Sequence, residues 1–580
     1  MASLFEPGRI GPVEVPNRIV MASMTTRAAD AEGFVTPQTL AYYIARARGG
    51  VGLITVEMAS PERCGRHRRR ELGIYDDRFL PGLRELVAAI HSQGAKASIQ
   101  LGHAGGHTRA DVCGEEPIAP SAIPHVVQEV TTQTIVPLAM TLERIEETTA
   151  AFVRAAERAC AAGFDCVEIH GAHGYLISQF HTPFENRRED DYGGRLENRA
   201  RFGLEMTRRV KKAVPGLGLI YRVTVDDFFP EGLQPEEGLK IAEWAAASGA
   251  DAVHVAAGHY RSLASSPGMI PPMARADATF LPFACALKSR INVPVIAVGR
   301  LGDPQVAQAA LADGACDFVA LGRPLLADAD WPRKVRTGEP VRRCIACNTC
   351  ITGMRTGGVL HCLVNARTGR EQLYAGRSAP QGMRIAVVGA GPAGLTYATL
   401  VAAGNEVAVF ERRSQAGGAL RQAALAPRFQ EVDADSGSLA RYIADLESAC
   451  VRAGVHIHYR IDVTKEPERL AGFNHVVVAT GARYRAGLRW LVAMLLETGI
   501  ARWPGLDALF ERPGVRNFLY HRARCATGTR VALLAQPHQS VIVIGDAAQP
   551  GESATAIASA FDAALRDPIG ALHPKRIQRP

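Results

Sequence analysis

Short runs of apolar and β-branched residues alternate with longer amphipathic segments along the first 335 positions. In segments such as "LPGLRELVAAIHSQG", apolar residues recur every three to four positions and glycine follows the last turn, which is typical of α-helices. The apolar runs have the length and composition of buried strands. There are eight of them: "RIVMASM", "GLITVEM", "KASIQLG", "FDCVEIHG", "LGLIYRVTVD", "ADAVHVAAG", "VPVIAVGR" and "CDFVALGR". Eight alternating strand and helix units predict a parallel (β/α)8 TIM barrel over residues 1–335.

A different pattern begins near residue 376. The stretch "MRIAVVGAGPAGLTYATLVAAGNEVAVFERR" starts as a strand, turns through a G-x-G-x-x-G motif, continues as a helix and ends a second strand at Glu411. This order is the dinucleotide-binding fingerprint, in which a pyrophosphate binds at the helix N-terminus. The later runs "VVVATGA" and "VIVIGDAAQP" supply further strands. We therefore predict a Rossmann-like nucleotide-binding domain formed by residues 376–482 and 541–580.

A cluster of cysteines lies between these two patterns, in "RRCIACNTCITGMRTGGVLHC". Zinc ribbons usually bring two separated C-x2-C pairs, so three closely spaced thiolates and one distant partner favour a [4Fe-4S] cluster over zinc. Placed between two cofactor domains, such a cluster relays single electrons. We predict an iron-sulfur segment over residues 336–375 with the ligands Cys344, Cys347, Cys350 and Cys362.

Composition and charge limit the classes of function. The chain is 47% hydrophobic and 21% charged with no low-complexity block, as expected of a folded protein. Its formal charge of +8 is small for 580 residues and spread along the chain, so no nucleic-acid partner is expected. Because no apolar run reaches the ~18 residues of a membrane span, we expect a cytoplasmic protein with no membrane partner.

One local run of basic residues, "RHRRR" at Arg66–Arg70, departs from the even distribution of charge. We expect a solvated loop there. The alternative is a site for the phosphates of a substrate such as an acyl-CoA.

Polar residues gather at the C-terminal ends of the predicted strands, where barrel enzymes build their active sites. Gln100 offers a planar donor and acceptor edge, and Arg222 places a fixed positive charge beside a ring that becomes anionic on reduction. Both residues suit a flavin. Glycine-arginine pairs end the seventh and eighth strands, where barrels bind phosphate through backbone N–H groups.

Several stretches resemble the old yellow enzyme family of FMN-dependent barrels over essentially all of residues 1–335: "NRIVMASMTTR", "GVGLITVE", "IQLGHAG", "EIHGAHGYLISQF", "NRREDDYGG", "ENRARF", "VGRLGDP" and "FVALGRPLLADAD". The resemblance implies FMN as cofactor. It implies that the chain near Thr25 touches the flavin ring, that Gln100 and Arg222 bind the pyrimidine side, and that the glycine-arginine pairs hold the phosphate. The implied FMN-binding residues are Ser23, Met24, Thr25, Glu57, Gln100, Arg222, Gly299, Arg300, Gly322 and Arg323.

The stretch "HGAHGYL" follows the fourth predicted strand. His170 and His173 are able to donate hydrogen bonds to one carbonyl oxygen, so that the β-carbon of a conjugated double bond accepts a hydride. The resemblance gives Tyr175 the task of protonating the α-carbon. We predict all three residues as catalytic, the alternative being a structural or metal-binding His-x-x-His.

The order of flavin barrel, four-cysteine motif and FAD-type fold is similar to the multidomain group of this family that contains 2,4-dienoyl-CoA reductase and trimethylamine dehydrogenase. In that group the second nucleotide site holds either FAD, which NAD(P)H reduces, or ADP without a redox role. The residues implied at this site are Gly389, Gly391, Ala393, Gly394, Glu411, Arg412, Gly418, Thr480, Gly481 and Asp546.

The chain departs from that group after residue 482, where relatives insert a second nucleotide-binding domain. Only about 58 residues lie there, and they contain no glycine-rich fingerprint. We interpret residues 483–540 as a truncated remnant of the NAD(P)H-binding insertion, in which "LRWLVAMLLETGI" covers the surface that the insertion leaves. This departure puts reduction of FAD by NAD(P)H in doubt.

We predict a reductase of activated C=C bonds, with an enoyl-CoA or dienoyl-CoA, an enone or an enoate as its small-molecule substrate. The alternative is an amine dehydrogenase or N-demethylase that passes electrons through the cluster to an external electron-transfer protein. Against it, the cage tryptophan that would bind a methylated ammonium group is replaced by Met354. A non-catalytic scaffold is the third hypothesis, for the part beyond Ala482. The sequence does not decide whether the protein forms a homo-oligomer.

Overall fold

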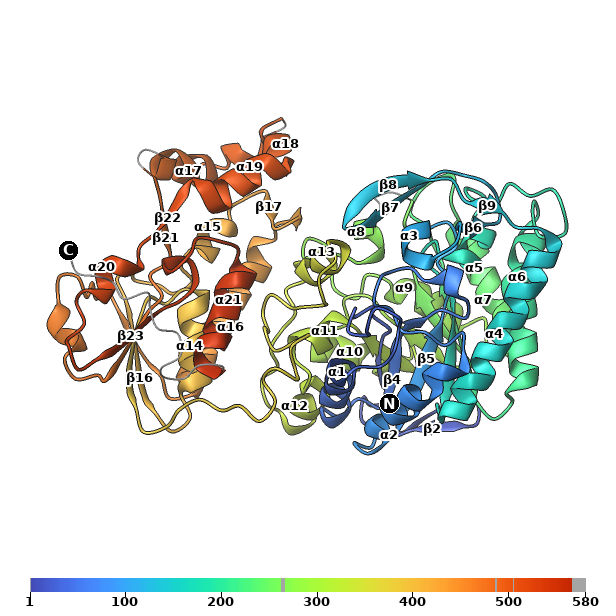
Figure 1. Cartoon of the computed structure of the whole chain (residues 1–580), viewed down its shortest axis with the longest axis horizontal. Helices are drawn as coiled ribbons and strands as arrows, with labels where there is room; N and C mark the ends of the chain where they lie inside the picture. Colours follow the sequence, from blue (N-terminus) through green and yellow to red (C-terminus); the bar gives the residue numbers. More distant parts are fainter. Residues whose placement is uncertain (1, 262–265, 486–487, 504, 566–580) are drawn as a thin grey trace. The chain divides into compact units, whose positions relative to one another are not determined.

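The computed structural model describes residues 2–261, 266–485, 488–503 and 505–565, which form two compact units (Figure 1). The first unit comprises Met1–Cys344 and Cys350–Leu360, and the second comprises Ile345–Thr349 and His361–Pro580. The predicted iron-sulfur segment is therefore divided between the two units.

The first unit contains a closed eight-stranded barrel whose neighbouring strands are all parallel, as the sequence predicts. A hairpin of β1 (Gly8–Ile10) and β2 (Val13–Val15) packs on the core at the N-terminal ends of the strands. Each predicted apolar run supplies one barrel strand: β3 (Ile19–Met21), β4 (Leu53–Ala59), β5 (Lys96–Leu101), β10 (Cys166–Gly171), β11 (Gly218–Thr224), β12 (Ala252–Ala256), β13 (Val295–Ala297) and β14 (Phe318–Leu321).

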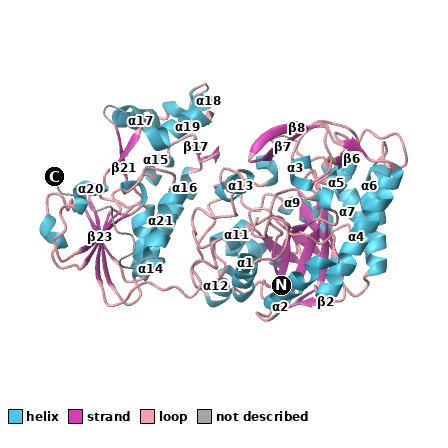
Figure 2. Ribbon diagram, in the orientation of Figure 1, coloured by secondary structure: helices cyan, strands magenta, loops and turns pink. Residues whose placement is uncertain are grey.

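Helices surround the barrel strands (Figure 2). Their ends follow from capping residues: in α4 the Thr141 hydroxyl accepts from the Arg144 N–H, and Gly163 ends the helix at φ 92°. The predicted fold class is confirmed. The helices are α1 (Pro37–Arg48), α2 (Leu80–His91), α4 (Leu142–Ala162), α6 (Leu196–Ala213), α7 (Pro235–Ala247), α9 (Leu281–Lys288), α10 (Pro304–Ala312), α11 (Arg323–Ala327) and α12 (Trp331–Thr337).

Short elements occupy the loops that follow the strands. The antiparallel pair β7 (His125–Glu129) and β8 (Thr131–Ile135) is the longest of them. The others are α3 (Ala110–Cys113), β6 (Ile118–Ala119), β9 (Leu138–Ala139), α5 (Leu176–His181) and α8 (Ser266–Met269). A further short helix, α13 (Thr349–Arg355), lies after α12 in the predicted iron-sulfur segment.

The basic run at residues 66–70 is the solvated loop expected from the sequence only at Arg69 and Arg70, which are exposed. Arg66, His67 and Arg68 are buried. Arg68 Nη1 lies 3.1 Å from Glu129 Oε2 of β7, and Arg27 forms a bidentate ion pair with the same carboxylate. The prediction was wrong for residues 66–68, because β7 supplies a buried acid that pairs with the buried guanidinium groups of Arg27 and Arg68.

The second unit is built on a five-stranded parallel sheet in the order β19-β16-β15-β20-β23. The strands are β15 (Arg384–Val388), β16 (Glu406–Glu411), β19 (His456–Tyr459), β20 (His475–Val478) and β23 (Ser540–Val543). The helices α14 (Pro392–Val401), α16 (Ser436–Arg452) and α21 (Ser553–Leu565) pack together beside it, with α15 (Leu420–Ala423) and the hairpin β17 (Arg428–Phe429) and β18 (Val432–Asp433). This is the Rossmann-like domain that the sequence predicts.

The segment between β20 and β23 is mostly helical in its described residues. It begins with β21 (Ala482–Tyr484), which pairs antiparallel with β22 (Arg524–Ala526). The helices are α17 (Leu488–Glu497), α18 (Leu506–Glu511), α19 (Pro513–Asn517) and α20 (Gly528–Ala532). Throughout the described ranges of the chain, no helix has the length and apolar character needed to cross a membrane.

Candidate active site and nucleotide site

Side chains from neighbouring barrel strands meet at one level of the barrel. In the parallel register His170 of β10 is paired with Arg222 of β11, and Arg222 with His254 of β12. Gln100 of β5 is paired with Glu168 of β10. Paired residues of parallel strands project to the same face of the sheet, so the predicted residues Gln100, His170 and Arg222 lie together.

Gln100 and Arg222 differ in how far their polar groups are already hydrogen-bonded. Ser23 Oγ donates to Gln100 Oε1 at 3.0 Å, and Gln100 Nε2 donates to Glu168 Oε1 at 2.7 Å. Burial alone would raise the pKa of Glu168, but the charges of His254 and Arg222 lower it to about 2. Arg222 Nε is buried and has no hydrogen-bond partner among the described residues. A buried N–H of this kind fits an acceptor on a bound group such as a flavin ring.

The predicted phosphate-binding pairs end β13 and β14. Arg300 lies 2.8 Å from Asp277 through Nη2 and Oδ1, and Arg323 Nη2 donates to the Pro271 carbonyl at 2.8 Å. Gly299 has φ 109°, a backbone conformation that favours glycine. Gly322 is the N-cap residue of α11. Because both arginine side chains have protein partners, a phosphate role for these pairs depends mainly on backbone N–H groups.

Residues 23–26 follow β3 and are held in place by Glu57. Ser23, Met24 and Thr25 are half-buried. Thr26 donates to Glu57 through its backbone N–H at 2.8 Å and through its hydroxyl at 2.6 Å. Burial raises the pKa of Glu57 to about 8. Glu57, itself predicted to bind the cofactor, thus holds Thr26 in place next to the predicted residues 23–25.

Replacing Glu57 with glutamine is expected to weaken the pH dependence of stability. A glutamate in the unfolded chain titrates near pH ~4.3, so the folded protein binds an extra proton between there and the raised pKa of Glu57. Stability therefore falls as pH rises through this window, by at most about 1.4 kcal/mol per pH unit for one group. Urea unfolding of both proteins across the window measures the slope. Equal slopes in the wild type and Glu57→Gln would refute the assignment.

The three predicted catalytic residues form one cluster at the end of β10. The His170 ring centroid lies 5.4 Å from that of His173 and 4.8 Å from that of Tyr175. His173 has φ 68°, an uncommon conformation for a non-glycine residue. Its N–H donates to Thr224 Oγ1 at 2.8 Å and its carbonyl accepts from the Tyr260 N–H at 3.2 Å. Backbone strain of this kind is typical of functional sites.

All three side chains of this cluster are neutral hydrogen-bond donors. Burial lowers the pKa of both His170 and His173 well below the ordinary range, and the charge of Arg222 lowers it further. Burial raises the pKa of Tyr175, so its phenol keeps its proton. Within the described part of the chain, His170 Nδ1 is buried without a hydrogen-bond partner. Two neutral imidazoles and one phenol are thus available to donate to a bound molecule.

Sequence analysis missed His67, which contacts this cluster. Tyr175 Oη lies 2.9 Å from His67 Nδ1. The rings of His107 and Tyr260 complete the surroundings of His67, at centroid distances of 5.5 Å and 6.1 Å. No local signal separates His67 from the arginines beside it, because its partner is 108 residues away in the sequence.

Glu62, Cys64 and His103 place three potential metal-ligand atoms within 4.8 Å of one another. Arg144 already occupies this group: its guanidinium donates to Glu62 Oε1 at 2.9 Å and to Cys64 Sγ at 3.2 Å. His103 Nδ1 accepts from the Gly105 N–H, so the neutral ring carries its proton on Nε2 and has no lone pair there for a metal. The group is a buried ion-pair network.

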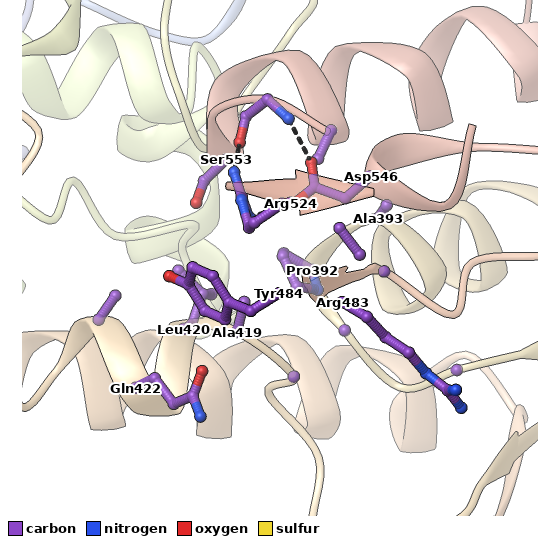
Figure 3. A pocket seen from close by; sticks show the side chains of 18 of the residues that line it. Pro392, Ala393, Ala419, Leu420, Gln422, Arg483, Tyr484, Arg524, Asp546 and Ser553 are labelled. Carbon is purple, nitrogen blue, oxygen red and sulfur yellow. Dashed lines mark hydrogen bonds and ion pairs between the residues drawn. The ribbon is translucent and has the colours of Figure 1, made fainter. Parts of the chain in front are cut away.

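The second unit contains a pocket between the glycine loop, the ends of its parallel strands and the segment 482–524 (Figure 3). A Cβ at Gly389 would lie 2.5 Å from the Ala479 carbonyl, and one at Gly394 would lie 2.0 Å from the Gly389 carbonyl. Packing therefore requires both glycines. At Gly391 a Cβ would project into open space in front of α14. This cradle fits a pyrophosphate at a helix N-terminus.

Nine of the ten residues predicted at this site line the pocket, and Gly394 lies behind them as a packing residue. Glu411 is fixed by the N–H groups of Ala390 and Arg413, both at 2.9 Å. Its position at the end of β16 is that of the ribose-binding acid in the fingerprint. The lining residues are Gly389, Gly391, Ala393, Glu411, Arg412, Gly418, Thr480, Gly481 and Asp546.

The segment between β20 and β23 contributes residues that no sequence motif indicates. Arg524 Nη1 lies 2.8 Å from Asp546 Oδ2, and the Gly551 N–H donates to Asp546 Oδ1 at 3.1 Å (Figure 3). The apolar part of the lining comes from the same segment and includes Val492, Leu495, Leu496 and Leu519. The segment 482–524 therefore forms one wall of the pocket. That "LRWLVAMLLETGI" covers exposed surface stays a prediction.

The predicted cluster ligands fall in both units. Cys344 and Cys350 belong to the first unit, and Cys347 and Cys362 to the second. Thr349 Oγ1 donates to Cys347 Sγ at 3.3 Å. The [4Fe-4S] site stays a prediction from the cysteine spacing.

A family model decides the assignment of the first unit. The model of the NADH:flavin oxidoreductase / NADH oxidase family matches residues 3–341, more than half of the chain. The chain belongs to this family. A second model, the NAD(P)-binding Rossmann-like domain, matches residues 387–449. The family confirms a flavin-dependent oxidoreductase with an FMN barrel.

Named relatives match most of the chain. An NADH oxidase of Thermoanaerobacter brockii is 39% identical over 83% of this chain and 73% of its own length. A cinnamate reductase of Clostridium sporogenes is 32% identical over 88% of this chain and 78% of its own length. A solved complex of 2-naphthoyl-CoA reductase with 2-naphthoyl-CoA has a TM-score of 0.86, with 23% identity over 97% of this chain and 99% of that one. At this identity the likeness shows the fold, which is that of the multidomain group.

Proposed function

We propose that this protein reduces activated C=C bonds of a small unsaturated carbonyl compound. The observation that carries the proposal is the cluster of neutral His170, neutral His173 and protonated Tyr175 at the end of β10. The relative named cinnamate reductase supports the same class of reaction.

Each residue of the cluster has a chemical task in this proposal. His170 and His173 donate N–H hydrogen bonds to the carbonyl oxygen and stabilise the negative charge that develops there. Tyr175 donates its phenol proton to the α-carbon. Gln100 and Arg222 bind the FMN ring, which supplies the hydride when it is bound and reduced.

The second site and the cysteines complete the proposed set of cofactors. The pocket at Gly391 takes FAD, or ADP in its place, and Cys344, Cys347, Cys350 and Cys362 hold a [4Fe-4S] cluster that connects the two redox centres. NAD(P)H is the proposed donor, as the name of the NADH oxidase relative suggests.

Gly391→Ala is expected to lower the content of bound adenine nucleotide by about tenfold or more, because the added methyl group enters the space of the pyrophosphate. The backbone at Gly391 has φ −81°, which alanine adopts without strain, so the fold should persist. Nucleotide released by denaturation, measured by chromatography, gives the result. Gly437→Ala on α16 is the control, because a Cβ there meets only ordinary contacts at 3.5 Å. A full complement of nucleotide in Gly391→Ala would contradict the assignment.

The surroundings of the cluster favour an enone or enoate over an acyl-CoA or an amine. Arg66 and Arg68 are buried, and of the two exposed arginines of the run Arg69 pairs with Asp111 at 2.6 Å, so the basic run gives only weak support to binding of CoA phosphates. The Arg355 guanidinium lies 5.5 Å above the ring of Tyr260. Cation-π binding of an ammonium substrate needs an open aromatic face, and Arg355 already covers the face of Tyr260.

Anaerobic titration of the purified full-length protein tests the proposal. NADH or NADPH should bleach the flavin absorbance, and cyclohexenone or cinnamate should restore it. Crotonyl-CoA and trimethylamine are the competing substrates. Bleaching by the amine, with no bleaching by either nicotinamide and no reoxidation by an enone, would replace this proposal with amine oxidation.

A further inference from the structure

The phenol of Tyr175 has a buried hydrogen-bond partner that the proposed reaction does not yet use. His67 Nδ1 lies 2.9 Å from Tyr175 Oη, and both side chains are buried. We propose that His67 is a positioning residue for proton transfer: its Nδ1–H donates to Tyr175 Oη, directs the phenol proton toward the substrate and stabilises the phenolate that forms. This inference rests on the proposed function.

The direction of the hydrogen bond follows from the two ring nitrogens. Burial and the charge of Arg68 lower the pKa of His67, so the ring is neutral and carries one proton. His67 Nε2 is buried and has no hydrogen-bond partner among the described residues. A buried N–H group without a partner is rarer than a buried acceptor without one. We therefore assign the proton to Nδ1, which has a partner, and leave the lone pair on the unpartnered Nε2. Tyr175 Oη then accepts from His67. The phenol of Tyr260 is a second hydrogen-bonding neighbour of Tyr175, and the bound substrate takes its place as the acceptor of the Tyr175 proton.

The loop that carries His67 is fixed from both sides. The backbone N–H groups of His67 and Arg68 donate to Glu71 Oε2 at 2.6 Å and 3.0 Å. The Arg68 side chain pairs with Glu129. Thr108 Oγ1 donates to the carbonyl of Arg66 at 2.6 Å. Such anchoring holds an imidazole in one orientation, which a group that aligns a reacting proton requires.

The chemical step balances without a proton from His67. The O–H bond of Tyr175 breaks as a C–H bond forms at the α-carbon of the substrate, and the phenolate is left with a hydrogen bond from His67 Nδ1–H. Water returns the proton to Tyr175 when the product leaves. A hydrogen bond to a charged oxygen is stronger than one to a neutral oxygen, so His67 stabilises the state after proton transfer more than the state before it.

The test follows the oxidative half-reaction of the reduced holoenzyme by stopped flow with two oxidants. Reduction of cyclohexenone needs a proton at carbon, whereas reduction of nitrocyclohexene yields a nitronate that is stable without one. His67→Phe should slow the reaction with cyclohexenone by roughly 10- to 100-fold, the effect of one charge-assisted hydrogen bond. The reaction with nitrocyclohexene should stay within about threefold of wild type, since it uses no phenol proton.

His67→Asn is the matched variant, because the side-chain amide of asparagine returns an N–H donor near the position of Nδ1. It should recover most of the rate with cyclohexenone. Equal slowing with both oxidants, or no recovery in His67→Asn, overturns the role of His67. A wild-type reduced enzyme that neither oxidant reoxidises overturns the proposed function itself, and this inference with it. Thermal unfolding of each variant shows whether a lost rate reflects a lost fold.

Discussion

Replacing His170 and His173 together by alanine is expected to lower kcat for an enone by about 10³-fold or more. Removing one donor of an oxyanion-binding pair typically costs about 10²- to 10³-fold in kcat, and here both donors are lost. FMN should stay bound, because the proposed ring contacts come from Gln100 and Arg222 and the phosphate contacts from the ends of β13 and β14. Steady-state assays, with flavin absorbance as the measure of cofactor content, check both parts.

Two further variants separate chemistry from structure. His173→Asn removes the imidazole but keeps a residue type that tolerates the φ of 68° found at this position. His91→Ala removes a histidine of α2 whose side chain is 38% exposed, and it should leave turnover unchanged. Turnover of the double alanine variant within tenfold of wild type would show that the carbonyl is bound elsewhere.

Replacing Glu129 with alanine is expected to destabilise the barrel unit by about 3–5 kcal/mol, because one partner of a buried ion pair is removed. Glu129 is the shared partner of Arg27 and Arg68, and all three side chains are at most 2% exposed. Without it, two guanidinium groups stay buried next to the loop of His67. Urea unfolding followed by fluorescence measures the change.

Glu146→Ala is the control for the loss of Glu129. The pair of Glu146 with Arg209 is also an ion pair, but its side chains are 65% and 41% exposed. Exposed pairs contribute about 0–1 kcal/mol. If both variants lose the same stability, the buried pair has no special role in this fold.

Local sequence was enough for the barrel and the nucleotide fold. The eight apolar runs each became one barrel strand, and the G-x-G-x-x-G motif became the turn between β15 and α14. The residues at strand ends were predicted for the same reason, because parallel strands with short loops bring their C-terminal ends to one face. Tyr175 was assigned from a resemblance that extends over the barrel.

The sequence by itself therefore determined what depends on periodicity and spacing: the strands, the helices, the glycine loop, and the set of strand-end side chains that includes His170 and Arg222. Only the tertiary structure decided which distant residues neutralise or orient one another. Glu129 forms an ion pair with the buried Arg68, and His67 forms a hydrogen bond with Tyr175. Arg524 forms an ion pair with Asp546. Such pairings leave no periodic trace, because they depend on loop paths that tertiary packing sets and local propensity does not encode.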